Sequence, residues 1–122
     1  MEYIRNIAQL IIALGILNVW LLRFNKATVY RGGGAKNMKQ EFATYGLPVW
    51  FMWFVGGLKV LLALSLLVSF WRPELMRPAA IGMAILMLGA VGMHIRIGDA
   101  LKKTLPALSV LILSLLVAFL PV

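Results

Sequence analysis

The sequence predicts an all-α membrane protein, an antiparallel four-transmembrane-helix bundle with a short interfacial helix in the first loop. Of its 122 residues, 62% are hydrophobic and 13% are charged, whereas a soluble domain is about 45–50% apolar and about 25% charged. The charged residues also leave four long segments nearly free of them, at 6–22, 42–71, 78–95 and 104–122. A spanning helix needs about 20 predominantly apolar residues, so four such helices account for most of the chain.

The first helix is expected over about residues 3–22. Its apolar part is longer than the roughly 7–15 residues of a signal peptide, and its end, LLRFNK, offers no small-residue cleavage site, so we expect it to be retained. Trp20 is predicted to be an interfacial anchor near its cytoplasmic end. Asn18 is predicted to be a buried hydrogen-bond partner for another helix.

The first loop is predicted to contain the interfacial helix, over about residues 37–45. The three glycines before it, residues 32–34, have little intrinsic order, and no Gly-Lys-Ser/Thr follows them to favour a phosphate-binding loop. Asn37 can cap the helix, with Gln40 at the position a capping box requires. One face then carries Met38, Phe42 and Tyr45. We expect that face to lie in the headgroup boundary or to close the cytoplasmic mouth of the bundle.

The other spanning helices are expected over about residues 48–70, 78–97 and 104–121. Proline punctuates them: Pro48 precedes the second, the RPELMRP turn separates the second from the third, and Pro106 lies near the start of the fourth. Ala79, Gly82 and Gly89 form a stripe of small residues that favours close helix packing. With no internal repeat, we predict a single transmembrane domain over residues 1–122.

The basic residues are distributed unequally between the two ends of the predicted bundle. One end has three of them, Arg5, Arg72 and Arg77. The other has eight: Arg23, Lys26, Arg31, Lys36, Lys39, Arg96, Lys102 and Lys103. Because basic loops face the cytoplasm and its anionic lipids, we predict both termini outside the cytoplasm. The net charge of +8 therefore indicates a membrane surface and not nucleic acid as the partner.

Lys59 interrupts the second predicted helix near its middle, about 16 Å from either end. A charge there costs about 2.5–3.5 kcal/mol on insertion scales. One interpretation is that its side chain snorkels toward the end marked by Trp53. The other is that it points into a polar cavity, where its amine binds a carboxylate, phenolate or quinone oxygen or relays a proton. Gly56 and Ala63 share its face and indicate that it faces a neighbouring helix.

The segment MHIRIGD, residues 93–99, supplies further candidates. Arg96 and Asp99 are three residues apart and are expected to pair with each other, with Glu41 or with the lysines at 102 and 103. His94 is a candidate proton acceptor or hydrogen-bonding group near the cytoplasmic boundary; the alternative is a packing histidine.

A metal site is not expected. Met83, Met87 and His94 share a stripe whose soft ligands would suit Cu(I), but Met83 and His94 are about 16 Å apart along the helix. The chain has no cysteine for disulfides or thiol redox chemistry and only four acidic residues for paired-carboxylate catalysis. We therefore expect no catalytic activity of the chain on its own.

The segments EFATYGLP and MHIRIGD, together with the lysine of GGLKVLLALSLL, resemble the DoxX-like family of small four-helix integral membrane proteins. The resemblance covers nearly the whole chain. It implies a role beside redox enzymes, because the family's name comes from a subunit associated with thiosulfate:quinone oxidoreductase. It also admits an assembly role, because a vertebrate relative assists the assembly of acetylcholine receptors.

Three functions are consistent with these patterns. The first is an accessory subunit of a bacterial inner-membrane redox system that binds a small apolar or quinone-like molecule among the first three spanning helices. The second is an assembly or chaperone factor for a partner membrane protein, and the third is a small-molecule transporter that works as an oligomer. The candidate ligand-binding residues are Asn18, Glu41, Tyr45, Lys59, His94, Arg96 and Asp99.

Overall fold

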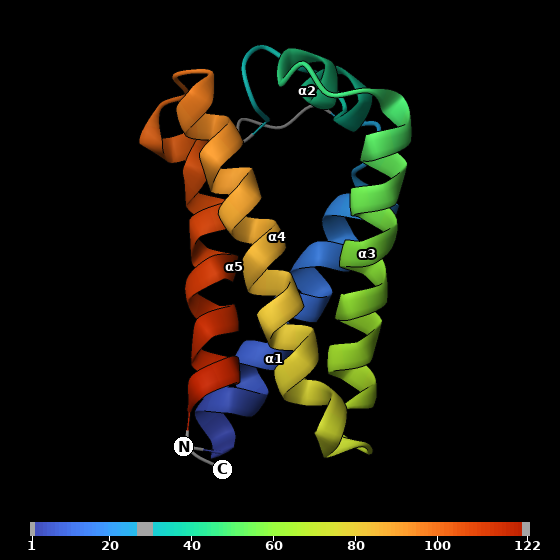
Figure 1. Cartoon of the computed structure of the whole chain (residues 1–122), viewed down its shortest axis with the longest axis vertical. Coiled ribbons are helices and arrows are strands. Elements are labelled where there is room, and N and C mark those ends of the chain that lie inside the picture. Colours follow the sequence, from blue (N-terminus) through green and yellow to red (C-terminus); the bar gives the residue numbers. More distant parts are fainter. Residues whose placement is uncertain (1, 27–30, 121–122) are drawn as a thin grey trace.

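The computed structural model describes residues 2–26 and 31–120, and its long helices form an up-and-down bundle (Figure 1). Helix α1 (Glu2–Leu17) continues into a π-helical turn, η1 (Asn18–Leu22). The short helix α2 (Met38–Thr44) precedes α3 (Val49–Val68). A 3₁₀ turn, η2 (Pro73–Leu75), leads into α4 (Met76–Arg96), and α5 (Leu101–Phe119) follows.

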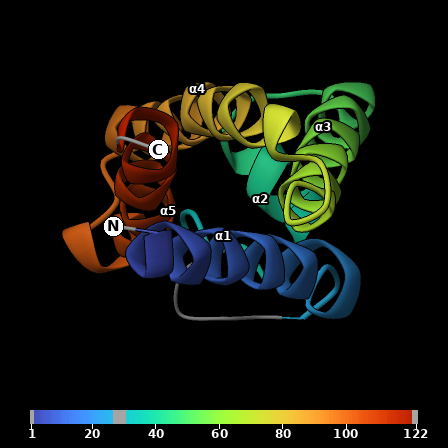
Figure 2. The same cartoon turned by 90° about the horizontal axis from the view of Figure 1, so that it is seen from below.

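The four long helices surround a central space in the order α1, α3, α4, α5. Helices α1 and α4 each pack against both α3 and α5, so that every neighbouring pair is antiparallel. Viewed along the bundle, α2 lies across the far end of the four long helices (Figure 2). This arrangement confirms the predicted four-helix bundle with a short helix in the first loop.

The outer surface of the bundle is apolar. All four long helices have the length and hydropathy needed to cross a membrane. Large apolar side chains on each of them are exposed on the outside, for example Leu14, Leu61, Leu88 and Ile112. Water would not tolerate so large an exposed apolar surface, whereas the hydrocarbon of a bilayer matches it. The chain is therefore a multi-pass integral membrane protein.

The interface between α1 and α3 is built around a tryptophan and a glycine. Trp20 extends the buried row of Ile12 and Ile16 at four-residue spacing and is only 7% exposed. Its indole ring lies against Gly56, where a β-carbon would come within 2.3 Å of the ring. The prediction that Trp20 is an interfacial anchor is therefore wrong, because the missing side chain at Gly56 lets the indole pack inside the bundle.

Helix α5 begins at Leu101, about a turn before Pro106, which consequently lies inside the helix. Ala100 is extended, with ψ of 152°, and starts the helix without a side-chain cap. Pro106 has no N–H to donate to the carbonyl of Lys102, one turn earlier. Since the loss falls near the start of the helix, α5 continues past the proline.

Substitution of Gly56 tests the packing of Trp20. A β-carbon at this position collides with the indole, so Gly56→Ala should destabilise the bundle by about 1–3 kcal/mol. The neighbouring Gly57 has nothing within 4 Å of an added β-carbon, and Gly57→Ala should be neutral or stabilising. Thermal unfolding of both variants in detergent checks this, and equal effects of the two substitutions would contradict the packing described.

Candidate functional site

A cavity of about 870 Å³ occupies the half of the bundle that α2 covers. Its walls are mainly apolar and come from all four long helices, with α2 and the loop before it at the closed end. The sequence placed this cavity among the first three spanning helices only. Helix α5 also contributes, through Ala107 and Val110, because it packs beside both α1 and α4.

Lys59 projects into this cavity from the middle of α3. The residue is 9% exposed, and its Nζ lies 5.6 Å from the centroid of the Trp20 ring, a cation–π contact. Within the part of the chain that the structure describes, no carboxylate lies within ion-pair distance of that ammonium. The contact with Trp20 shows that the side chain faces the neighbouring helix, as Gly56 and Ala63 on its face predicted.

Five of the seven residues predicted from the sequence line the cavity: Asn18, Glu41, Tyr45, Lys59 and His94. Asp99 lies directly behind His94 and bonds to it. Arg96 does not join them, because its side chain is exposed at the end of α4. Asn18 is also exposed and not buried between helices as predicted, because it begins the π-helical turn where α1 meets the loop.

The end of α2 fixes the position of Tyr45. Gly46 adopts a left-handed conformation with φ of +77°, which lets two backbone N–H groups turn back onto the helix. The N–H of Leu47 donates to the carbonyl of Phe42, and that of Gly46 donates to the carbonyl of Ala43, both at 3.0 Å. This is a Schellman ending, and it holds Tyr45 at the C-cap of α2, with its side chain buried.

The end of α4 is built in the same way and brings Asp99 back to His94. Gly98 has φ of +73°, and the N–H of Asp99 donates to the carbonyl of His94 at 3.0 Å. The reversal places the Asp99 carboxylate 2.7 Å from His94 Nδ1. Asp99 therefore pairs with His94, which was not among the partners that the sequence offered for it, Arg96 and the lysines at 102 and 103.

Two glycines of the first loop, Gly32 and Gly33, pack closely against the end of α2. A β-carbon at Gly32 would come within 2.7 Å of the Tyr45 ring. Gly33 has φ of +58°, donates its N–H to Asp99 Oδ1 at 2.9 Å and accepts from the Lys103 ammonium. This loop thereby connects α2 with the α4–α5 turn.

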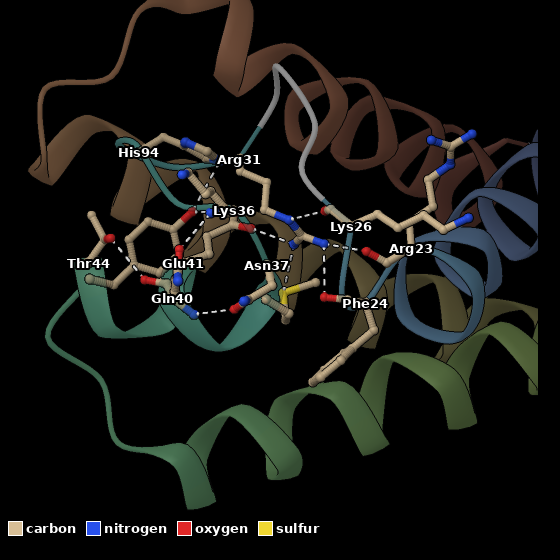
Figure 3. A network of polar contacts seen from close by, with 12 residues as sticks. Arg23, Phe24, Lys26, Arg31, Lys36, Asn37, Gln40, Glu41, Thr44 and His94 are labelled. Atoms are coloured by element: carbon tan, nitrogen blue, oxygen red, sulfur yellow. Dashed lines mark hydrogen bonds and ion pairs between the residues drawn. The ribbon is translucent and has the colours of Figure 1, made fainter.

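Arg31, which sequence reasoning missed as a site residue, fastens the start of this loop (Figure 3). It is only 4% exposed, and its Nη1 lies 2.9 Å from Glu41 Oε2. The rest of its guanidinium donates to three backbone carbonyls, those of Arg23, Phe24 and Lys26. The composition of so basic a loop does not indicate which of its arginines is buried. The one available hint was that Glu41 needed a cation.

A continuous polar chain runs from Arg31 across the closed end of the cavity. The Tyr45 hydroxyl donates to Glu41 Oε1 at 2.8 Å and lies 3.4 Å from His94 Nε2. Burial, and then the neighbouring Glu41 carboxylate, raise the pKa of Tyr45, so it remains a neutral phenol that can donate this hydrogen bond. Below α2 the rings of Trp20, Phe42, Tyr45 and His94 follow one another with centroids 5.8–6.0 Å apart.

The Asp99 carboxylate orients the His94 ring. Its side chain is 6% exposed, and burial by itself raises the pKa of Asp99. The hydrogen bond from the Gly33 N–H and the contact with His94 outweigh burial, so that the pKa of Asp99 lies below its ordinary value. A carboxylate can only accept, so His94 Nδ1 carries a proton. The ring is thereby held with Nε2 toward Tyr45 and the cavity.

The opposite end of the bundle has a smaller hollow of about 520 Å³ beside Gln9 and Ser69. The Gln9 amide donates to the Ser69 hydroxyl at 2.6 Å, which joins α1 to the end of α3. This buried hydrogen bond satisfies part of the hydrogen-bonding capacity of the two side chains.

Fold and site together define a multi-pass membrane protein whose helical bundle encloses a largely apolar cavity with a polar closed end. The family model described as the DoxX-like family matches residues 12–118. Since this range covers most of the chain, the protein belongs to the DoxX-like family, as the EFATYGLP and MHIRIGD segments indicated. Neither the curated proteins nor the solved structures contain a match to the chain.

Removing the Tyr45 hydroxyl tests the polar chain. In Tyr45→Phe, one oxygen of the partly buried Glu41 carboxylate loses its donor, and we expect a loss of about 1–3 kcal/mol in unfolding free energy. Tyr3→Phe is the matched control, because Tyr3 is 82% exposed. Thermal unfolding in detergent measures both. Equal stability of wild type and Tyr45→Phe would show that this bond does not hold α2 in place.

Acidification tests the Asp99 carboxylate. Because the pKa of Asp99 is depressed in the folded protein, its stabilising contribution is present above the ordinary carboxyl pKa of about 3.9 and is lost as pH falls through the folded value. We expect Asp99→Asn to unfold at a lower temperature than wild type near neutral pH, with the difference shrinking below about pH 4.

Glu74→Gln is the control for this acid titration, because the Arg72–Glu74 pair at 3.6 Å is largely exposed and should contribute little. A difference between wild type and Asp99→Asn that stays constant throughout the titration would contradict the role given to the carboxylate.

Proposed function

We propose that this protein is an accessory subunit of a bacterial inner-membrane redox system and binds a small, largely apolar, quinone-like molecule in the cavity above Lys59. The unpaired Lys59 ammonium in an apolar cavity carries the proposal. A charge so deep in the membrane is costly, which makes it a candidate for a functional residue. The volume of the cavity also fits, because ligand cavities commonly measure about 300–1,000 Å³.

The groups around the cavity suit an oxygen-bearing head on an apolar body. Lys59 offers an ammonium donor, and His94 presents Nε2 beside the Tyr45 hydroxyl. The Trp20 and Phe42 rings form an apolar floor next to these polar groups. A quinone would supply electron and proton exchange with a redox enzyme when bound, and this chain would hold its carbonyl oxygens and exclude water.

The distribution of basic residues supports placing α2 and the α4–α5 turn on the cytoplasmic side, with both termini outside. On this topology the closed end of the cavity faces the cytoplasm. The alternative function, an assembly factor for a partner membrane protein, needs no molecule in the cavity and is therefore separated from this proposal by the experiment below.

Fluorescence of Trp20 tests the proposal, because quinones quench indoles that they contact. Three of the four tryptophans are exposed at 61–79% and can be replaced, as Trp50→Phe, Trp53→Phe and Trp71→Phe, to leave Trp20 as reporter. A short-chain ubiquinone added to this background in nanodiscs should quench Trp20 saturably. Linear quenching with no saturation would contradict the proposal and favour the assembly role.

The chain offers a matched pair of glycines on α4 as the control. Neither Gly89 nor Gly92 has anything within 4 Å of an added β-carbon, but of these two only Gly89 lines the cavity. Gly89→Leu should fill the cavity and weaken quenching at least about tenfold, as expected for competing occupancy. Gly92→Leu should leave the quenching unchanged, and equal effects of both would refute binding in the cavity.

A further inference from the structure

We infer that the cavity above Lys59 also accepts amphiphiles with a carboxylate head and an apolar tail, and that it prefers a single negative charge on such chains. This inference rests on the ligand cavity of the proposed function and adds a second ligand class to it. Two observations favour a carboxylate: the charged residues that line the cavity, and the partners that some of them already have.

The cavity wall is strongly positive. Among the lining residues that the structure describes, four are basic and one is acidic: Arg23, Arg31, Lys59 and Lys103 against Glu41. Both Glu41 oxygens are already engaged, one by Arg31 and the other by Tyr45. The negative charge of Glu41 is therefore already offset by Arg31, and an amine head would meet a wall with excess positive charge.

One of these cations lies deep in the cavity and is left for a ligand. The Arg31 guanidinium is occupied by Glu41 and by three backbone carbonyls. The Lys103 ammonium donates to the Gly33 carbonyl, and Arg23 is exposed at the rim. Lys59 remains, because among the described residues its ammonium contacts the Trp20 ring and no carboxylate lies within ion-pair distance of it. A single deep cation matches a monovalent carboxylate better than a divalent phosphate.

The surroundings of Lys59 strengthen such a pair. The Trp20 ring on one side and the apolar walls on the other exclude water, and an ion pair in so apolar a site is stronger than one at the surface. The tail would extend along the apolar wall formed by Val55, Leu86 and Val110.

Brominated amphiphiles in nanodiscs test the inference, with Trp20 as the sole tryptophan. Bromine quenches an indole only at short range, so 4,5-dibromostearate and the corresponding 4,5-dibromostearyl alcohol, whose bromines lie close to the head, report occupancy by chains that differ only in the head. We expect the carboxylate to quench Trp20 at a mole fraction at least about tenfold lower than the alcohol. Equal quenching by the two would overturn the inference.

Two variants assign the preference to Lys59. In Lys59→Met the carboxylate and the alcohol should quench equally, while Lys59→Arg should keep the preference because it keeps the charge. A preference that survives Lys59→Met would overturn the assignment. If the short-chain quinone binds saturably and the carboxylate shows no preference, this inference fails and the proposed function stands; if nothing saturates, both fail.

Discussion

The fastening of α2 across one end of the bundle depends on burying Glu41 between Arg31 and Tyr45. Without these two donors, a carboxylate at the rim of the cavity would have to reach water and draw α2 away from the bundle. With them, a seven-residue helix that could not hold its structure alone becomes a fixed cover. The Gly33 N–H then extends the connection to Asp99 and His94, so that the loop, α2 and the α4–α5 turn are joined into one polar layer.

The role proposed for Lys59 depends on this polar layer. A lysine in the middle of a membrane helix can often reach an interface with its long side chain, yet here the ammonium stops above the Trp20 ring inside the cavity. At the closed end, Arg31 pairs with Glu41, and the Asp99 carboxylate accepts from His94 and from the Gly33 N–H. This layer does not neutralise the charge of Lys59, which lies deeper in the cavity. The apolar volume beside Lys59 has room for a ligand that would neutralise it.

The fold was predictable because each spanning helix needs only an apolar segment of sufficient length, and proline and glycine mark the turns. The interior was only partly predictable. Tyr45, His94 and Lys59 could be selected as uncommon polar residues within apolar segments. Arg31 could not be distinguished from the other basic residues of the first loop, because its burial follows from tertiary contacts with Glu41 and the preceding turn. The pairing of Asp99 with His94 depends on the left-handed turn at Gly98, whereas helical spacing alone favours Arg96 as the partner.

The central claim is that the bundle holds one small molecule above Lys59, and native mass spectrometry of the protein extracted from membranes tests it most directly. The account predicts a stoichiometric adduct on the wild-type chain that is lost in Lys59→Met and in Gly89→Leu and is retained in Gly92→Leu. A wild-type chain without an adduct, or an adduct held equally by all four proteins, would contradict the account.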